Sequence, residues 1–176
     1  MTWQTHALVG ANVAWLAALL PSTSASLAIV GALGRVAALL PDIDAQSAKI
    51  HYIGKGILGI FRGLFEHRGF FHSFLAVGIV GVISSSIAWY FDFEWSLPLA
   101  VTLGYASHLL IDGFTIGGVR YLFPRTKKFR LLPKAICTTT KGNGDIALLI
   151  FAALGLVIFF WLHYQDVSLS AKFLSL

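Results

Sequence analysis

The chain has 176 residues, of which 57% are hydrophobic and only 12% are charged, and its mean hydropathy is +0.77. Because a soluble domain is about a quarter charged, this composition excludes an ordinary soluble fold and indicates a lipid environment. Only helix bundles and closed barrels satisfy every backbone polar group in lipid. Since long apolar runs recur and alternating strands do not, the sequence predicts an all-α integral membrane helical bundle, with residues 1–176 as a single domain.

Five apolar runs are long enough to be short transmembrane helices. Pro21 and Pro41 end the first two runs, and Pro98 suits the first turn of the fourth. The predicted helices cover residues 5–20, 23–40, 73–90, 97–114 and 146–164. Apolar residues at helical spacing in 49–66 predict an amphipathic helix lying in the membrane interface, and the basic, aromatic stretch 121–140 predicts a loop or a short hairpin.

The lysines and arginines set the predicted orientation. Eleven of the 13 lie in loops on the side that holds residue 6, whereas Lys172 lies on the other side and Arg35 lies inside the second helix. The positive-inside rule places the basic side in the cytoplasm, where these loops would bind anionic lipid headgroups. The formal net charge of +5 is therefore attributed to membrane orientation, and no nucleic acid is expected as a partner.

Candidate metal ligands lie at the helix ends on this same side. His108 and Asp112 are four residues apart, so they share a helix face, and imidazole and carboxylate are both suitable ligands for zinc or manganese. Asp42 and Asp44 follow Pro41 at a helix carboxyl end, where acidic groups oppose the helix dipole. A nearby cation would compensate for these two charges. For each pair the alternative is structural: a helix-end His–Asp pair or two solvated acids.

The densest motif runs from His67 to Ser73. Its two histidines, His67 and His72, are five residues apart and would not share a helix face, so His67 is placed in the preceding loop. Arg68 could hold a phosphate, and Ser73 is either a helix cap or a catalytic hydroxyl. The whole ligand set exceeds what one tetrahedral zinc site needs, which predicts two or more metals: His6, Asp42, Asp44, His67, His72, His108, Asp112 and, with a doubtful assignment, Asp145.

The order of these motifs resembles the membrane-bound metal-dependent hydrolase family, most closely its LexA-regulated inner-membrane members. The matching stretches are Thr5-His6, 40–44, 67–73, 104–112 and 141–143, so the resemblance covers nearly the whole chain. It implies an inner-membrane protein with a metal-dependent hydrolase site. His108 and Asp112 are also distantly similar to the metal site of zinc phospholipase C and P1 nuclease. One departure is that Asp145 stands near the place where family members often carry a glutamate.

The sequence thus predicts an inner-membrane hydrolase for a phospholipid or another amphipathic phosphate, using divalent metal ions, with zinc favoured over manganese. A metal-activated water would attack, Asp42 or Asp44 would accept its proton, and Arg68 and Lys141 would bind the substrate phosphate. Two alternatives remain open: a metal transporter or sensor, which the scarcity of charges within the membrane helices disfavours, and a non-catalytic membrane adaptor with a structural metal site. The oligomeric state is not predicted.

Overall fold

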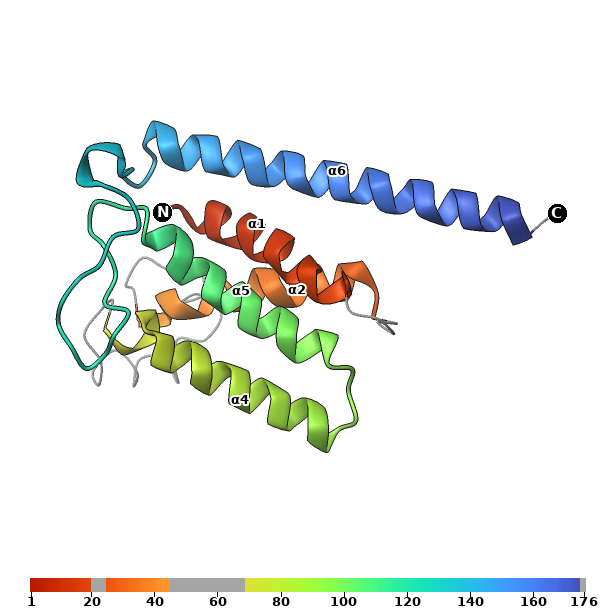
Figure 1. Cartoon of the computed structure of the whole chain (residues 1–176), viewed down its shortest axis with the longest axis horizontal. Coiled ribbons are helices and arrows are strands. Elements are labelled where there is room, and N and C mark those ends of the chain that lie inside the picture. Colours follow the sequence, from red (N-terminus) through yellow and green to blue (C-terminus); the bar gives the residue numbers. More distant parts are fainter. Residues whose placement is uncertain (20–24, 45–68, 175–176) are drawn as a thin grey trace.

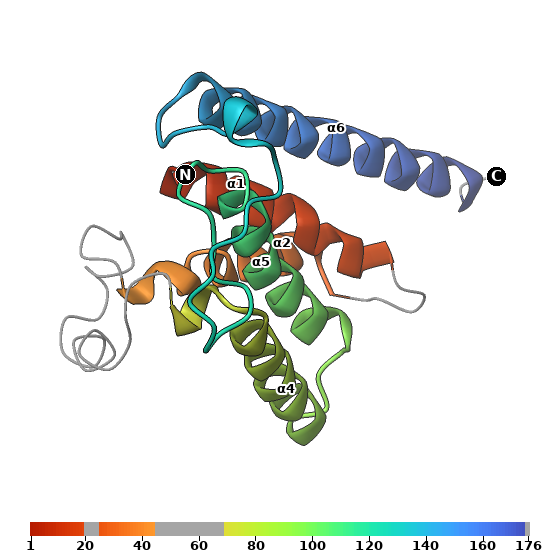
Figure 2. The same cartoon turned by 60° about the vertical axis from the view of Figure 1, so that its left-hand side comes forward.

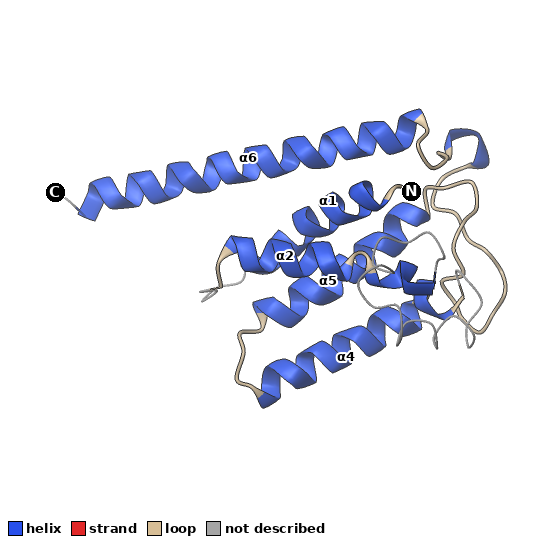
Figure 3. Cartoon of the chain, turned by 180° about the vertical axis from the view of Figure 1, so that it is seen from behind, coloured by secondary structure: helices blue, strands red, loops and turns tan. Residues whose placement is uncertain are grey.

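The computed structural model describes residues 1–19, 25–44 and 69–174. These residues are all-helical, without a strand, and form five α-helices joined by turns, loops and short 3₁₀ segments (Figure 3). The predicted interfacial helix at 49–66, with Lys49, Lys55 and Arg62, lies outside the described residues. The α-helices are α1 (Trp3–Ala14), α2 (Leu27–Ala37), α4 (Phe74–Tyr90), α5 (Ser96–Asp112) and α6 (Asn143–Leu174).

Three helices make the packed centre of the molecule. Helices α1, α2 and α5 contact one another, α4 lies against α5, and α6 lies along α1 (Figures 1 and 2). The close approach depends on Gly10, Gly34 and Gly104: a Cβ at Gly10 would lie 2.6 Å from the Gly34 carbonyl oxygen, and one at Gly104 would lie 2.7 Å from the Gly34 Cα. Small residues allow such backbone contact between helices in membranes.

The first two helices are shorter than the sequence predicts. After Ala14 the chain tightens into a 3₁₀ segment, Trp15–Leu19, and α2 begins only after Ser26, whose side chain accepts a hydrogen bond from the Ile29 N–H. Several hydroxyl residues precede α2, and the sequence alone does not reveal which one caps it. Their 12 and 11 α-helical residues extend only about 17–18 Å, compared with a bilayer core of about 30 Å.

Helix α6 is longer than predicted, because no proline or glycine interrupts the chain after Gly155. Its segment Asn143–His163 is the one described helix long and apolar enough to cross a membrane, and α4 is a shorter apolar helix. Most of the large apolar side chains of Asn143–His163 are exposed, with Phe151 at 78%. This exposure fits a helix surrounded by lipid, whereas the five crossings of the prediction are not established by helix length.

The segment between α5 and α6 is held close to the end of α5. Val119 and Phe129 exchange backbone hydrogen bonds at 2.9 and 2.8 Å, and the Leu131 N–H donates to the Gly113 carbonyl at 2.9 Å. Thr115 forms a second, isolated bridge with Thr138. Of the predicted loop or short hairpin at 121–140 the structure therefore shows a loop, with one isolated antiparallel pair, Val119–Phe129, and one isolated parallel pair, Thr115–Thr138. The basic loop 113–142 is therefore fixed over one end of the bundle.

Candidate metal centre

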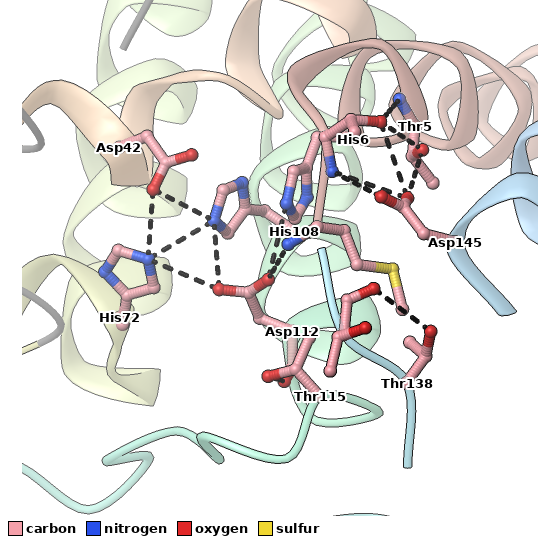
Figure 4. Close-up of polar contacts among 12 residues, drawn as sticks. Thr5, His6, Asp42, His72, His108, Asp112, Thr115, Thr138 and Asp145 are labelled. Atoms are coloured by element: carbon pink, nitrogen blue, oxygen red, sulfur yellow. Dashed lines mark hydrogen bonds and ion pairs between the residues drawn. The ribbon is translucent and has the colours of Figure 1, made fainter. Parts of the chain in front are cut away.

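The candidate ligands meet at the end of the bundle where α1 and α4 begin and α2 and α5 finish (Figures 1 and 4). The structure brings together five of the eight predicted residues, which we call the His–Asp cluster: His6, Asp42, His72, His108 and Asp112. Each comes from a different element, except that His108 and Asp112 share α5 as their spacing predicts. Their convergence agrees with the expected common side.

Two histidine nitrogens lie at the centre of the cluster. The Nε2 atoms of His72 and His108 are 3.2 Å apart. Asp42 Oδ1 lies 3.5 Å from His72 Nε2 and 3.7 Å from His108 Nε2. On the opposite side of the histidine pair, Asp112 Oδ2 lies 3.8 and 3.7 Å from the same two atoms (Figure 4). The histidine pair is thus bordered by a carboxylate on either side.

These separations fit the donor set of a zinc-type site. Ligand atoms about 2.0–2.2 Å from a tetrahedral zinc ion lie roughly 3.3–3.6 Å from one another. The His72–His108–Asp42 triangle has sides of 3.2, 3.5 and 3.7 Å, which matches one face of such a tetrahedron. Each neutral imidazole can offer one Nε2 lone pair, and the 3.2 Å separation lets both histidines bind the same cation. The alternative to a cation is a proton on His72 Nε2, which would be donated in a hydrogen bond to His108 Nε2.

The backbone fixes which nitrogen of His108 is available. His108 Nδ1 lies 2.7 Å from the carbonyl oxygen of Ala38. Because a carbonyl only accepts, Nδ1 carries the proton and Nε2 presents its lone pair to the cluster. Ala38 is the C-cap of α2, so its carbonyl is one that the helix leaves available. Ligand histidines are commonly oriented by such a hydrogen bond on the far nitrogen.

His6 extends the cluster on the Asp112 side. Its Nε2 lies 3.3 Å from Asp112 Oδ1, and its ring stacks on His108 at a centroid distance of 3.7 Å. The amino group of Met1 also contacts Asp112 Oδ1, at 3.1 Å. The buried Nδ1 of His6 has no hydrogen-bond partner among the described residues. Asp112 therefore uses one oxygen toward the His72–His108 pair and the other toward His6.

Asp42 is the solvent-facing member of the cluster. Its side chain is 27% exposed, whereas those of the other four members are at most 2% exposed. Burial opposes ionisation, but the hydrogen bond with His72 and the nearby histidines outweigh it and hold the pKa of Asp42 well below its usual range. Asp42 is thus a carboxylate at neutral pH, which is the form that binds cations.

Asp145 lies apart from the cluster and holds two helix starts together. Its Oδ1 accepts a hydrogen bond from Thr5 Oγ1 at 2.6 Å, and its Oδ2 accepts from the Lys141 N–H at 2.8 Å and the Thr2 N–H at 3.1 Å (Figure 4). The structure therefore gives Asp145 a hydrogen-bonding role at the α1–α6 junction, in place of the cluster position expected from the sequence. The Lys141 side chain is exposed.

The remaining predicted residues are not placed in the cluster. His67 and Arg68 lie outside the described residues, and for Asp44 the backbone alone is described, within a 3₁₀ segment, Leu40–Asp44. Ser73 is the N-cap of α4: its Oγ accepts from the Ala76 N–H at 3.2 Å and donates to the Phe70 carbonyl at 2.6 Å. Of the two roles left open for Ser73, the structure shows the cap.

Two tyrosines that the sequence analysis missed support the cluster. Tyr105 donates to the Phe71 carbonyl at 2.7 Å and so fixes the turn that carries His72. Tyr121 donates to the Leu109 carbonyl at 2.9 Å, and burial, with the charge of Asp112, raises the pKa of Tyr121 to about 12. Tyr105 precedes His108 by three residues, so its place on the same helix face was a usable signal.

Comparison with known proteins places this chain in a family. An inner membrane protein YdjM of Escherichia coli is 36% identical over 111 residues, 60% of this chain and 53% of that protein. The uncharacterized protein YvsG of Bacillus subtilis is 33% identical over 103 residues, 58% of this chain and 62% of that protein. The matches thus span between half and two thirds of each relative's length. No solved structure matches. The model of the YdjM inner membrane protein family matches residues 1–167, and the chain belongs to that family.

Proposed function

We propose that this protein is a multi-pass inner-membrane hydrolase that uses a divalent metal ion to cleave a phosphoester of an amphipathic phosphate. Membership of an inner membrane protein family supports the location. The 11 cations assigned to the loops on the cluster side support a cytoplasmic site. The observation that carries the proposal is the triangle of His72, His108 and Asp42, because this arrangement matches one face of a metal coordination shell and leaves other positions for water.

His72, His108 and Asp42 would hold the cation, with Asp112 bordering it from the other side. A cation there would acidify a bound water and polarise a phosphoryl oxygen. Asp42 would accept the proton of the attacking water, because it is the cluster's one carboxylate open to solvent. Zinc is favoured over manganese by the imidazole content. A second cation would use His6 and Asp112 Oδ1, and Arg68 and Lys141 remain the proposed phosphate ligands.

The first test is metal content per chain, measured by elemental analysis of detergent-purified protein that carries no histidine tag. We expect at least about one zinc or manganese ion per wild-type chain and none in the His72→Ala/His108→Ala double variant. The matched control is His163→Ala, an exposed histidine on α6, which should keep the metal. A wild-type chain without metal after reconstitution with both ions would overturn the proposal.

The second test is turnover by the metal-loaded protein on a panel of phospholipids and soluble phosphodiesters. We expect release of product from at least one amphipathic substrate, and its loss in Asp42→Asn. Loaded protein that cleaves no member of the panel would contradict the hydrolase assignment even if the metal is present.

A structural metal site is the second candidate, favoured by one specific observation. Asp112 Oδ2 is nearly as close to the two histidines as Asp42 Oδ1 is, at 3.8 and 3.7 Å against 3.5 and 3.7 Å, so both carboxylates together would close the shell without a place for water. Cobalt substitution separates the two cases. Azide should change the visible spectrum of a cobalt ion that keeps an open position, whereas an unchanged spectrum would support the closed, non-catalytic site.

A further inference from the structure

An apolar groove lies along α5, between α4 and the loop that follows α5. It has a volume of about 280 Å³, and its lining includes Phe74, Val77, Ala106, Leu110, Tyr121 and Leu131. Ser107 and Leu109, the two chain neighbours of His108, also border it. Ala106 and Leu110 lie two positions to either side of His108, so the groove occupies the same turns of α5 as the cluster but the opposite face of the helix.

The groove is continuous with the basic loop. Tyr121 and Leu131 belong to the loop 113–142 and also form part of the groove wall. The hydrogen bonds of Leu131 to Gly113 and of Tyr121 to Leu109 hold that wall against α5. Whatever occupies the groove thus contacts an element that carries many positive charges.

The loop is unusual in its charge. Residues 113–142 contain seven lysines and arginines and no acidic residue. Arg125, Lys127 and Lys128 are exposed and nearly consecutive. Exposed apolar side chains lie among the cations, with Leu122 at 43% and Ile136 at 63% exposure. Cations interleaved with exposed apolar groups are typical of surfaces that contact anionic lipid.

We infer that the groove and the loop together bind one anionic phospholipid, with an acyl chain in the groove and the phosphate at Arg125, Lys127 and Lys128. The apolar wall suits an acyl chain and the loop charge suits an anionic headgroup. This lipid is distinct from the proposed substrate, whose phosphate is assigned to Arg68 and Lys141, so the inference does not rest on the proposed function.

The experiment uses a phosphatidylglycerol probe with a photoreactive group on its acyl chain, incorporated in detergent micelles. A phosphatidylcholine probe with the same chains is the lipid control. The protein is the His72→Ala/His108→Ala variant, so that no hydrolysis interferes, and labelled peptides are identified by mass spectrometry. We expect the label on α4 and α5 residues of the groove, with phosphatidylglycerol labelling at least about tenfold stronger.

Two pairs of variants locate the site. Leu110→Trp would fill the groove, and Ile83→Trp, at a residue of similar exposure in another apolar groove, is its matched control. We expect a loss of labelling of at least about fivefold for Leu110→Trp and none for Ile83→Trp. The Arg125→Gln/Lys127→Gln/Lys128→Gln variant should remove the preference for phosphatidylglycerol without affecting phosphatidylcholine labelling.

Equal labelling by the two lipids, or label spread evenly over α4 and α6, would mean that ordinary surrounding lipid is being detected and would overturn the inference. Specific labelling of the groove, combined with metal-loaded wild-type protein that cleaves no lipid, would keep the binding site and refute the hydrolase. Failure of specific lipid binding and failure of the proposed hydrolase activity would therefore give different results.

Discussion

Helices α1, α2 and α5 differ sharply from α6 in how they are packed. The three helices meet through glycine backbone contacts and carry His6, Ala38, His108 and Asp112 at one end. Helix α6 lies along α1, and most of its large apolar side chains up to His163 are exposed. The first region is a scaffold of closely packed helices, whereas the second is a hydrophobic helix with a few polar contacts to that scaffold. We therefore expect mutations in the two regions to differ in how much they change the free energy of unfolding and in whether they affect the His–Asp cluster.

The largest effect is expected at the glycine contacts. In Gly104→Ala the new methyl group would overlap the Gly34 backbone, and we expect the free energy of unfolding to fall by about 2–3 kcal/mol, with loss of the metal that the cluster is proposed to hold. Thermal unfolding in detergent, followed by circular dichroism, measures it. A fall of less than about 0.5 kcal/mol would show that the three helices adjust easily and would remove the contrast.

Asp145 tests how α6 is tied to the scaffold. Asp145→Ala leaves the donors of Thr2, Thr5 and Lys141 without their carboxylate, and we expect a loss of about 1–3 kcal/mol. Metal content should stay at the wild-type value, because the carboxylate lies outside the cluster. Stable protein that has lost its metal would instead identify Asp145 as a ligand.

Asn12 makes the polar contact farther along α6. Its Nδ2 donates to the carbonyls of Leu8 and Ala152 at 2.8 and 2.9 Å. Hydrogen bonds between membrane helices contribute modestly, so Asn12→Ala should lower the free energy of unfolding by about 0.5–1.5 kcal/mol. Asn143→Ala, at an exposed position, is the control. Equal thermal unfolding midpoints for the two variants would mean that the packing of α6 against α1 does not depend on Asn12.

The smallest effect, of opposite sign, is expected at Gly78 on α4. A Cβ there meets no atom within 4 Å, so Gly78→Ala should raise stability by about 0.5–1 kcal/mol through helix propensity alone. The same melting experiment measures it beside Gly104→Ala. Destabilisation at Gly78 would reveal a neighbour, such as a second copy of the chain, against this face.

The sequence predicts the helices and their order because long apolar runs and prolines mark them directly. It also predicts a common end of the bundle for the five cluster residues. Successive helices alternate in direction, so the order of the helices along the chain is enough to bring these helix ends together. It does not predict which hydroxyl caps α2, since Ser26 competes with similar neighbours.

The details within the site depend on tertiary contacts that no periodicity reveals. The partner of His108 is the backbone carbonyl of Ala38, and a carbonyl leaves no mark in an amino-acid sequence. Asp145 has the ligand chemistry of the other acids, and its different role follows from the positions of Thr2 and Thr5, which precede it by about 140 residues. The metal prediction depends on residue type, whereas these assignments depend on geometry.

The hydrogen bond from His108 to Ala38 has a consequence for how tightly the site would bind a ligand. The His108 ring cannot flip without losing its hydrogen bond to the Ala38 carbonyl. Its Nε2 lone pair therefore keeps one direction in the absence of a ligand. A preorganised donor loses little conformational freedom on binding. The fold sets the direction of this lone pair, so the His108 ring would not have to reorient when a cation binds.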